Sequence, residues 1–134
     1  MVYGLGVRSR FRLRGVHPDL VRVVETAIGR SSMDFTVLEG LRTAKRQAEL
    51  FNAGASKTMN SRHLTGHAVD LAPWIEGRVR WDWPLYDKLA ITLLGAASAL
   101  NIPLEWGGHW ETFKDGPHFQ LPWKDYPSGT AAIL

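Results

Sequence analysis

Two short blocks of histidine and aspartate, far apart in the chain, constrain its fold more than any other feature. The first block, Ser61 to Asp70, has the sequence SRHLTGHAVD, and the second, Asp115 to His118, has the sequence DGPH. Two imidazoles and one carboxylate, here His63, Asp70 and His118, are a donor set of catalytic zinc, which keeps a fourth position open for water. A fold that uses all three must bring the two blocks together.

The composition narrows the kinds of metal site and protein that are possible. The chain has 134 residues, 45% of them hydrophobic, so one folded domain with one core is expected. It contains no cysteine, which excludes disulfides and thiolate metal sites and leaves histidine, aspartate and glutamate as ligands. A net charge of +3 favours an ordinary soluble surface over a polyanion-binding one.

The N-terminal region carries four alternating arginines, Arg8, Arg10, Arg12 and Arg14, which predict the exposed face of an extended segment. No aromatic residues interleave with them in the way typical of nucleic-acid binding, so no nucleic-acid partner is expected. The first residues lack the apolar core of a signal peptide, and no apolar run approaches the ~18 residues of a membrane span. We therefore expect no membrane insertion.

The alternation of apolar and polar residues predicts an α+β fold. Helices are expected over 17–28, 43–52 and 82–100, and strands over 33–38, 67–71, 79–83, 104–106 and 118–121. The first helix should bury Leu20, Val23, Val24, Ala27 and Ile28, and the second should turn Ala44, Ala48 and Phe51 inward. Pro73 is expected to end its strand. The elements lack a βαβ rhythm, which indicates a small antiparallel sheet packed with helices.

The spacing inside the first block leaves two arrangements to weigh. On one regular strand, His63 and Asp70 would face opposite sides, but a turn at Gly66 would leave His63 in the loop before the strand. A helix would instead align His63, His67 and Asp70. A zincin helix needs glutamate directly after its first histidine, and this position is Leu64. We therefore predict the loop arrangement, with His67 structural or merely close to the site.

Three blocks in the same order resemble a known family. They are EGLRT at 39–43 with Gln47, the block at 61–70, and WGGHWETFKDGPHF at 106–119. Together they resemble the D-alanyl-D-alanine carboxypeptidases and VanY-type metallopeptidases of the hedgehog/DD-peptidase superfamily. Within that superfamily the chain is most similar to small phage endolysins that are L-alanyl-D-glutamate peptidases, from about residue 17 to residue 119.

The resemblance implies a role for each candidate residue. His63, Asp70 and His118 would hold one Zn2+ per chain, and Asp115, three residues before the last ligand, would be the catalytic base. Arg42 would bind a carboxylate of the substrate, which suits its planar pair of donors. The matching residues Gln47 and Ser61 would bind peptide or orient a ligand. Lys57 is a further candidate for the carboxylate, and His109 is predicted to be an edge residue rather than a spare ligand.

The implied protein is a peptidoglycan endolysin: a single catalytic domain, residues 1–134, without a separate wall-binding module. It would hydrolyse the L-alanyl-D-glutamate bond of stem peptides as a monomer. It would stay in the host cytoplasm until a holin lets it reach the periplasm and cell wall. Two alternatives remain, a D,D-carboxypeptidase that removes terminal D-alanine and a hedgehog-like binding module with a purely structural zinc. Most of the six tryptophans should fill the core and the sheet edges, and one or two should line the cleft.

Overall fold

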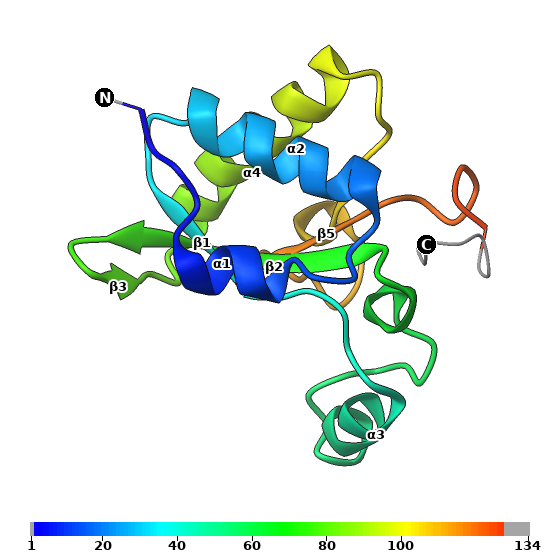
Figure 1. Ribbon diagram of the computed structural model, residues 1–134. Helices are drawn as coiled ribbons and strands as arrows, with labels where there is room; N and C mark the ends of the chain where they lie inside the picture. The colour runs from blue at the N-terminus through cyan, green and yellow to red at the C-terminus, as the bar shows by residue number, and fades with distance from the viewer. Residues whose placement is uncertain (1, 128–134) are drawn as a thin grey trace.

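A computed structural model describes residues 2–127, which form helices and a small antiparallel sheet (Figure 1). The predicted α+β class is therefore confirmed. The helices are α1 (Val7–Arg12), α2 (Pro18–Arg30), α3 (Ala44–Asn52) and α4 (Trp83–Ala99), with short 3-10 turns η1 (Arg62–Thr65) and η2 (Gly107–His109). The strands are β1 (Phe35–Glu39), β2 (Ala68–Ile75), β3 (Arg78–Val79), β4 (Glu105–Trp106) and β5 (His118–Gln120). None of the described helices is long and apolar enough to cross a membrane.

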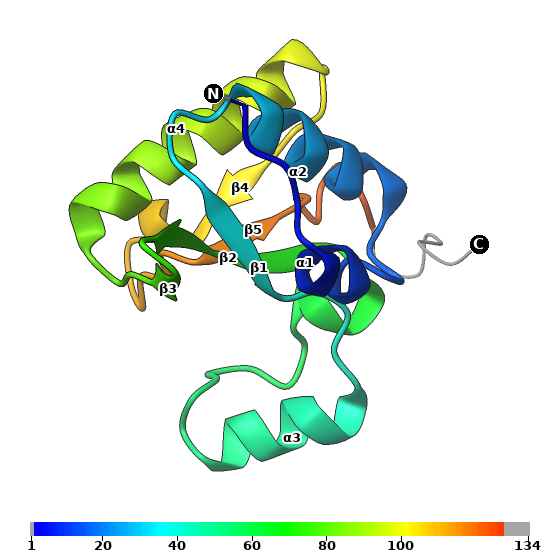
Figure 2. The same cartoon turned by 60° about the vertical axis from the view of Figure 1, so that its left-hand side comes forward.

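The strand β2 is the centre of the sheet, whose order is β1-β2-β5-β4 with β3 paired to the far end of β2. All of these pairings are antiparallel. Helices α2 and α4 lie together over one face of the sheet (Figures 1 and 2). The opposite face is therefore left for side chains that do not belong to the core.

The core lies between the helix pair and the sheet. All five predicted residues of the first helix are buried in α2, which confirms the helical stripe read from the sequence. The sheet contributes Val37, Val69, Leu71 and Phe119, each fully buried. Because successive residues of a strand face opposite sides, burying Val69 and Leu71 turns Asp70 away from the core.

The arginine-rich segment near the N-terminus is helix α1, so the predicted extended segment is wrong. The reason is a tertiary contact with the edge of the sheet. The Ser9 hydroxyl accepts a hydrogen bond from the Val37 backbone nitrogen at 3.0 Å, and Arg12 donates to the Val37 carbonyl at 3.0 Å. Helix α1 thus provides hydrogen-bond partners for the backbone of Val37 at the edge of β1. Without such partners, the groups of an edge strand could pair with other chains.

Helix α3 exists as predicted, but its expected inward face is wrong. Ala44 is exposed, Ala48 is half-buried, and Phe51 remains 43% exposed. The residue that α3 buries is Gln47. The helix stands away from α2 and α4 (Figures 1 and 2), so its apolar side chains have no core to enter.

Strand β2 continues through Pro73 to Ile75, so the predicted end of the strand at Pro73 is wrong. Pro73 pairs with Phe35 of β1. On the other side of β2 it lies beyond the segment paired with β5 and before the segment paired with β3. A proline at this gap between two partners removes no donor from either ladder, which is why the strand tolerates it.

Candidate metal centre

A row of polar side chains crosses the open face of the sheet. In the strand register, Asp70 of β2 is the partner of His118 on β5 and of Glu39 on β1. Directly opposed residues on neighbouring strands share a face of the sheet. The adjacent residues Val69 and Phe119 point into the core, so this row points away from it. The register therefore joins the two blocks that are far apart in the sequence.

His63 reaches the same row from the turn η1. The Ser61 hydroxyl accepts a hydrogen bond from the His63 backbone nitrogen at 3.1 Å and caps the turn. Gly66 ends it with φ of 77°, a left-handed conformation that glycine adopts without strain. A Cβ at Gly66 would also collide with the Gly15 carbonyl oxygen. The turn therefore leaves His63 in the loop before Asp70, as the sequence predicts.

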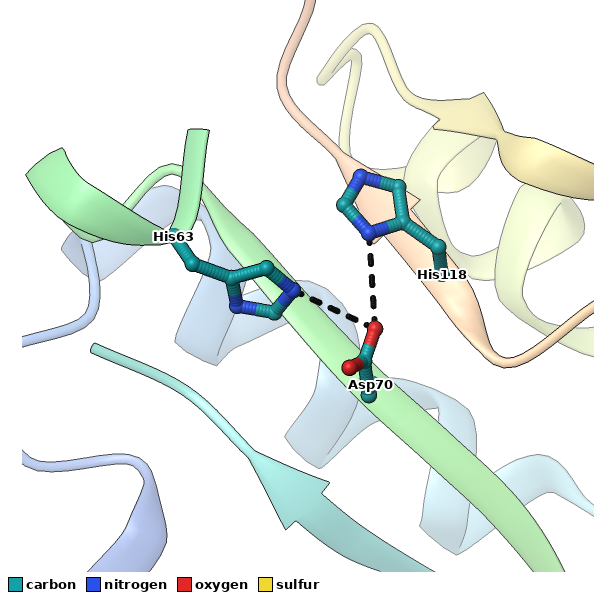
Figure 3. A group of neighbouring side chains, drawn as sticks. All are labelled: His63, Asp70 and His118. Carbon is teal, nitrogen blue, oxygen red and sulfur yellow. Dashed lines mark hydrogen bonds and ion pairs between the residues drawn. The ribbon is translucent and has the colours of Figure 1, made fainter. Parts of the chain in front are cut away.

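The three predicted ligands converge on one point (Figure 3). His63 Nε2 lies 3.2 Å from Asp70 Oδ1, and His118 Nδ1 lies 3.4 Å from the same oxygen. One donor atom from each residue falls within 4.8 Å of the others. Both imidazoles are nearly buried, and the Asp70 side chain is 21% exposed toward the cleft. This is a compact His-Asp-His set with one open side.

Outer hydrogen bonds fix which ring nitrogen faces the cluster. The Gly40 carbonyl oxygen lies 2.8 Å from His63 Nδ1, and a carbonyl can only accept, so this nitrogen carries the proton. The Gln120 amide oxygen lies 2.7 Å from His118 Nε2, and the Gln120 nitrogen donates to Glu105 at 3.2 Å, which sets the orientation of the amide. Each imidazole can thus present a lone pair to the centre of the cluster. Such partners are typical of metal-binding histidines.

The negative charge of Asp70 makes the cluster a favourable place for a cation. Burial alone would raise the pKa of Asp70, but hydrogen bonds from His118 and His63 outweigh it and hold that pKa well below its usual range. Burial would lower the pKa of His118, yet the Asp70 carboxylate and the Gln120 amide raise it. The carboxylate is thus held ionised, and it favours a positive charge on the facing ring of His118. A metal ion supplies that charge at the same point, so the residues fit one.

Asp115 lines the cleft beside the ligands. Its backbone nitrogen donates to the Gly107 carbonyl at 3.1 Å, and its own carbonyl accepts from the His118 nitrogen at 3.2 Å. A Cβ at Gly107 would lie 2.5 Å from the Asp115 carbonyl oxygen and 3.1 Å from the His118 Cβ, so this close approach requires glycine. Sequence reasoning gave Gly107 no role, although it lies in the block at 106–119.

Asp115 has the electrostatics of a group that can hold a proton. Burial raises the pKa of its carboxyl, and the negative charge of Asp70 raises it further. The nearby side chains of His118, His63 and Arg42 act in the opposite direction and lower this pKa, without cancelling the increase. A carboxylate with a raised pKa is a stronger base than one in water, which suits proton transfer.

The predicted substrate residues lie at different depths. The Arg42 side chain, only 8% exposed, donates to both carboxylate oxygens of Glu39 and to the Gln47 amide oxygen, the last at 2.7 Å. Its Nη2 lies 3.8 Å from Asp70 Oδ2. Gln47 is fully buried and donates to the Thr58 carbonyl oxygen at 2.5 Å. Arg42 and Ser61 line the cleft, whereas Gln47 lies behind Arg42 and ties it to the following loop.

The cleft has a volume of about 570 Å³ and two walls made of loops. One wall is the segment between α3 and η1, and the other lies between η2 and β5. Its aromatic lining is Trp110, Phe113 and Trp123, so two tryptophans face the cleft, as expected. Of the six tryptophans, all within the described residues, only Trp106 is buried, so the core part of that expectation is wrong for the other five. Trp74 lies on β2 and is paired with β3, where a sheet position was expected. A groove of this kind can take an extended peptide across the metal ligands.

Comparison with known proteins gives consistent matches. The family described as phage L-alanyl-D-glutamate peptidase matches residues 1–121. An L-alanyl-D-glutamate peptidase of Escherichia phage T5 is 32% identical over 138 residues, which cover all of both chains. One from a Listeria phage is 36% identical over 100 residues, and this match spans 75% of the present chain but 34% of that relative.

A solved structure extends the likeness to the fold. The crystal structure of the Serratia marcescens L-Ala D-Glu endopeptidase ChiX superimposes with a TM-score of 0.87 at 52% sequence identity. The match covers 91% of this chain and 92% of that one. The architecture and about half of the aligned residues are therefore shared with an endopeptidase of that name.

The two other histidines of these blocks lie outside the metal cluster. His67 is fully buried, with its Nδ1 2.6 Å from the Thr65 hydroxyl and its ring beside those of His17 and Tyr126. His109 is exposed and packs edge-on against Trp106. Neither is part of the His-Asp-His set. The structure thus agrees with the predictions that His67 is structural or close to the site and that His109 is an edge residue rather than a ligand.

His67 should make the stability of the fold depend on pH. Burial, with the positive charges of Arg62 and His17, lowers its pKa from 6.5 to about 4. The folded state therefore prefers the neutral ring, and this preference stabilises the fold above pH 6.5 and is lost as pH falls toward 4. From pH 7 to pH 4 the wild type should lose about 3 kcal/mol more unfolding free energy than His67→Gln, measured by urea denaturation.

The exposed residue His109 provides the control for this measurement. His109→Gln removes one histidine from the surface and should follow the pH dependence of the wild type. If His67→Gln also follows the wild type, burial of the neutral His67 ring does not contribute to acid sensitivity.

Proposed function

The chain belongs to the phage L-alanyl-D-glutamate peptidase family, and we propose that it is a zinc-dependent peptidoglycan endopeptidase that hydrolyses the bond between L-alanine and D-glutamate in stem peptides. The observation that carries this proposal is the His63-Asp70-His118 cluster with Asp115 beside it in one cleft. One chain supplies all of these groups. The site is complete without a partner subunit, which supports action as a monomer.

The donor set favours zinc among the common metals. His63 Nε2, His118 Nδ1 and the Asp70 carboxylate would hold the ion and leave one position open toward the cleft. When bound, zinc supplies a Lewis acid that lowers the pKa of water to ~7 and polarises the scissile carbonyl. The hydrogen bonds from His63 to Gly40 and from His118 to Gln120 keep both imidazoles oriented for this role.

Asp115 then carries the proton through the reaction. Its carboxylate takes a proton from the attacking water as the new carbon–oxygen bond forms at the L-alanine carbonyl. It returns that proton to the D-glutamate nitrogen as the carbon–nitrogen bond breaks, so that the products are a carboxylic acid and an amine. The raised pKa of Asp115 helps it to hold the proton between these two steps.

The alternatives place the same site in other roles. A D,D-carboxypeptidase would remove terminal D-alanine, but the matched relatives are named for the L-alanyl-D-glutamate bond. A binding module with a structural zinc needs no base in the cleft, whereas Asp115 lines it. Release from the host cytoplasm through a holin stays a prediction.

Digestion of purified peptidoglycan tests the proposal directly. Mass spectrometry should find new D-glutamate amino termini, and a chelator should prevent their formation until zinc is restored. Release of free D-alanine would identify a carboxypeptidase instead. Zinc binding without any cleavage would identify the binding module.

Removing a ligand should remove the metal. We expect one zinc per chain in the wild type, and His118→Ala should lose most of both metal and activity because two donors cannot complete the set. The metal is measured by mass spectrometry of the dialysed protein. His109→Ala removes an exposed histidine and should keep both properties. Full zinc content in His118→Ala would contradict the ligand assignment.

Asp115→Asn should separate chemistry from metal binding. The amide keeps the shape of the side chain but cannot accept a proton at neutral pH, so kcat should fall ~10²–10⁴-fold while zinc stays bound. Stopped or continuous peptide assays and metal analysis on the same sample measure both. Asp87→Asn on the exposed side of α4 is the matched control. Near-normal turnover by Asp115→Asn would make Asp115 a bystander.

Arg42→Lys should impair the enzyme although the charge is kept. Lysine lacks the planar pair of donors with which arginine binds both oxygens of a carboxylate. In the structure, Arg42 uses this pair to bind the carboxylate of Glu39. We expect lower kcat/KM on stem peptide with unchanged zinc content and unchanged circular dichroism. Arg42→Ala with wild-type kcat/KM would show that substrate binding does not use this residue.

A further inference from the structure

Lys57 lies at the mouth of the cleft and joins its two walls. It belongs to the loop between α3 and η1, and its ammonium nitrogen lies 5.1 Å from the centre of the Phe113 ring on the opposite wall. Both residues line the cleft. Phe113 has φ of 53°, a left-handed conformation that is uncommon for a bulky residue. The opposite loop thus holds an aromatic ring under the lysine despite this conformation.

The surroundings of the Lys57 ammonium group differ from those of the two arginines that line the cleft. Arg42 is paired with Glu39, and Arg62 is buried with its donors on the Leu121 and Tyr126 carbonyl oxygens. Among the described residues, Lys57 has no carboxylate within 4.0 Å of its nitrogen. It is exposed, and its ammonium group lies over the Phe113 ring. A substrate anion that enters the cleft therefore meets an ammonium without a carboxylate partner in the described part of the chain.

Arg42 and Lys57 lie at different depths in the cleft, since Arg42 is only 8% exposed and Lys57 is exposed. Arg42 lies 3.8 Å from the ligand Asp70, whereas Lys57 makes no such approach to Asp70 or Asp115. In the proposed substrate, D-glutamate has two carboxyl groups of which at most one continues the peptide, so a free carboxylate sits beside the scissile bond. Alanine, on the other side of that bond, has no charged side chain. A second carboxylate within reach of the rim must come from the residue that follows D-glutamate.

We propose that Lys57 binds a carboxylate on this following residue, and that the enzyme therefore prefers stem peptides whose third residue is a carboxylated diamino acid. This inference rests on the proposed function, since it assumes that the cleft holds the L-alanyl-D-glutamate bond at the metal ligands. Phe113 keeps the ammonium at the mouth, where the third residue passes. Lys57 acts as a specificity-determining residue and takes no part in the bond cleavage itself.

Two synthetic peptides isolate this carboxylate. Both contain N-acetyl-L-alanyl-D-glutamate linked to a third residue, either meso-diaminopimelate or L-lysine, which differ by one carboxylate. An exposed ion pair gives at most about a fivefold effect, so kcat/KM of the wild type should favour diaminopimelate by a factor up to about five. Lys57→Met should abolish this preference, and Lys57→Arg should keep it. The preference should also fall with added salt, which screens exposed charges.

Matched variants separate recognition of the carboxylate from packing of the loops. Lys88→Met removes an exposed lysine on α4 and should leave the preference unchanged. An unchanged preference in Lys57→Met overturns the inference. Equal losses on both peptides in Lys57→Met and Phe113→Leu also overturn it, because Lys57 would then only pack the loops together.

A third peptide identifies which carboxylate Lys57 binds. In it the free carboxylate of D-glutamate is replaced by an amide, with diaminopimelate kept. We compare kcat/KM for this amide with kcat/KM for the parent diaminopimelate peptide. If the wild type prefers the parent peptide and Lys57→Met loses this preference, while it keeps the preference for diaminopimelate over lysine, then Lys57 binds the D-glutamate carboxylate and the inference is overturned. Cleavage of the peptides at the alanine–glutamate bond supports the proposed function whatever the preference, so equal rates contradict the inference alone. Failure to cleave any peptide or peptidoglycan contradicts both.

Discussion

The site depends on the antiparallel register between β2 and β5. That register sets Asp70 opposite His118 and sends Val69 and Phe119 into the core on the other face. A slip of one residue would turn the carboxylate into the core and an apolar side chain into the cleft. Two backbone hydrogen bonds, Leu71 to the Pro117 carbonyl and Leu121 to the His67 carbonyl, extend the pairing beyond the strands at 2.9 Å each. Hydrophobic burial on one face therefore secures the geometry of the polar face.

On the polar face of the sheet, the side chains that orient the His-Asp-His set are themselves fixed by further hydrogen bonds. His118 is oriented by Gln120, and Gln120 by Glu105, each on strands of the same sheet. The Arg42 guanidinium bridges Glu39 and the buried Gln47, so the floor of the cleft is linked to the otherwise detached helix α3. Such chains of hydrogen bonds restrict ligand orientation more strongly than the ligands do alone. They also explain why a buried glutamine replaces an apolar contact in α3.

The sequence predicted what local pattern and short motifs determine. The stripe of α2, the turn at Gly66 and the convergence of His63, Asp70 and His118 follow from spacing and donor chemistry, or from resemblance. The helix α1 could not be predicted in this way, because its fit depends on Ser9 and Arg12 meeting Val37, 25 or more residues along the chain. The inward face of α3 failed for the same reason, since periodicity shows an apolar face but not whether a core lies against it.

Strands and a capped turn carry the His-Asp-His residues of the cleft, whereas loops form its walls. The three proposed metal ligands come from paired strands and a capped turn, where positions within a fraction of an ångström matter for chemistry. The walls come from loops that follow α3 and η2, whose side chains reach each other by the weak contact of Lys57 with Phe113. A weak contact can open for a peptide without disturbing the strands behind it. Differences in such walls, rather than in the His-Asp-His set, are therefore where members of one fold can differ in the peptides they accept.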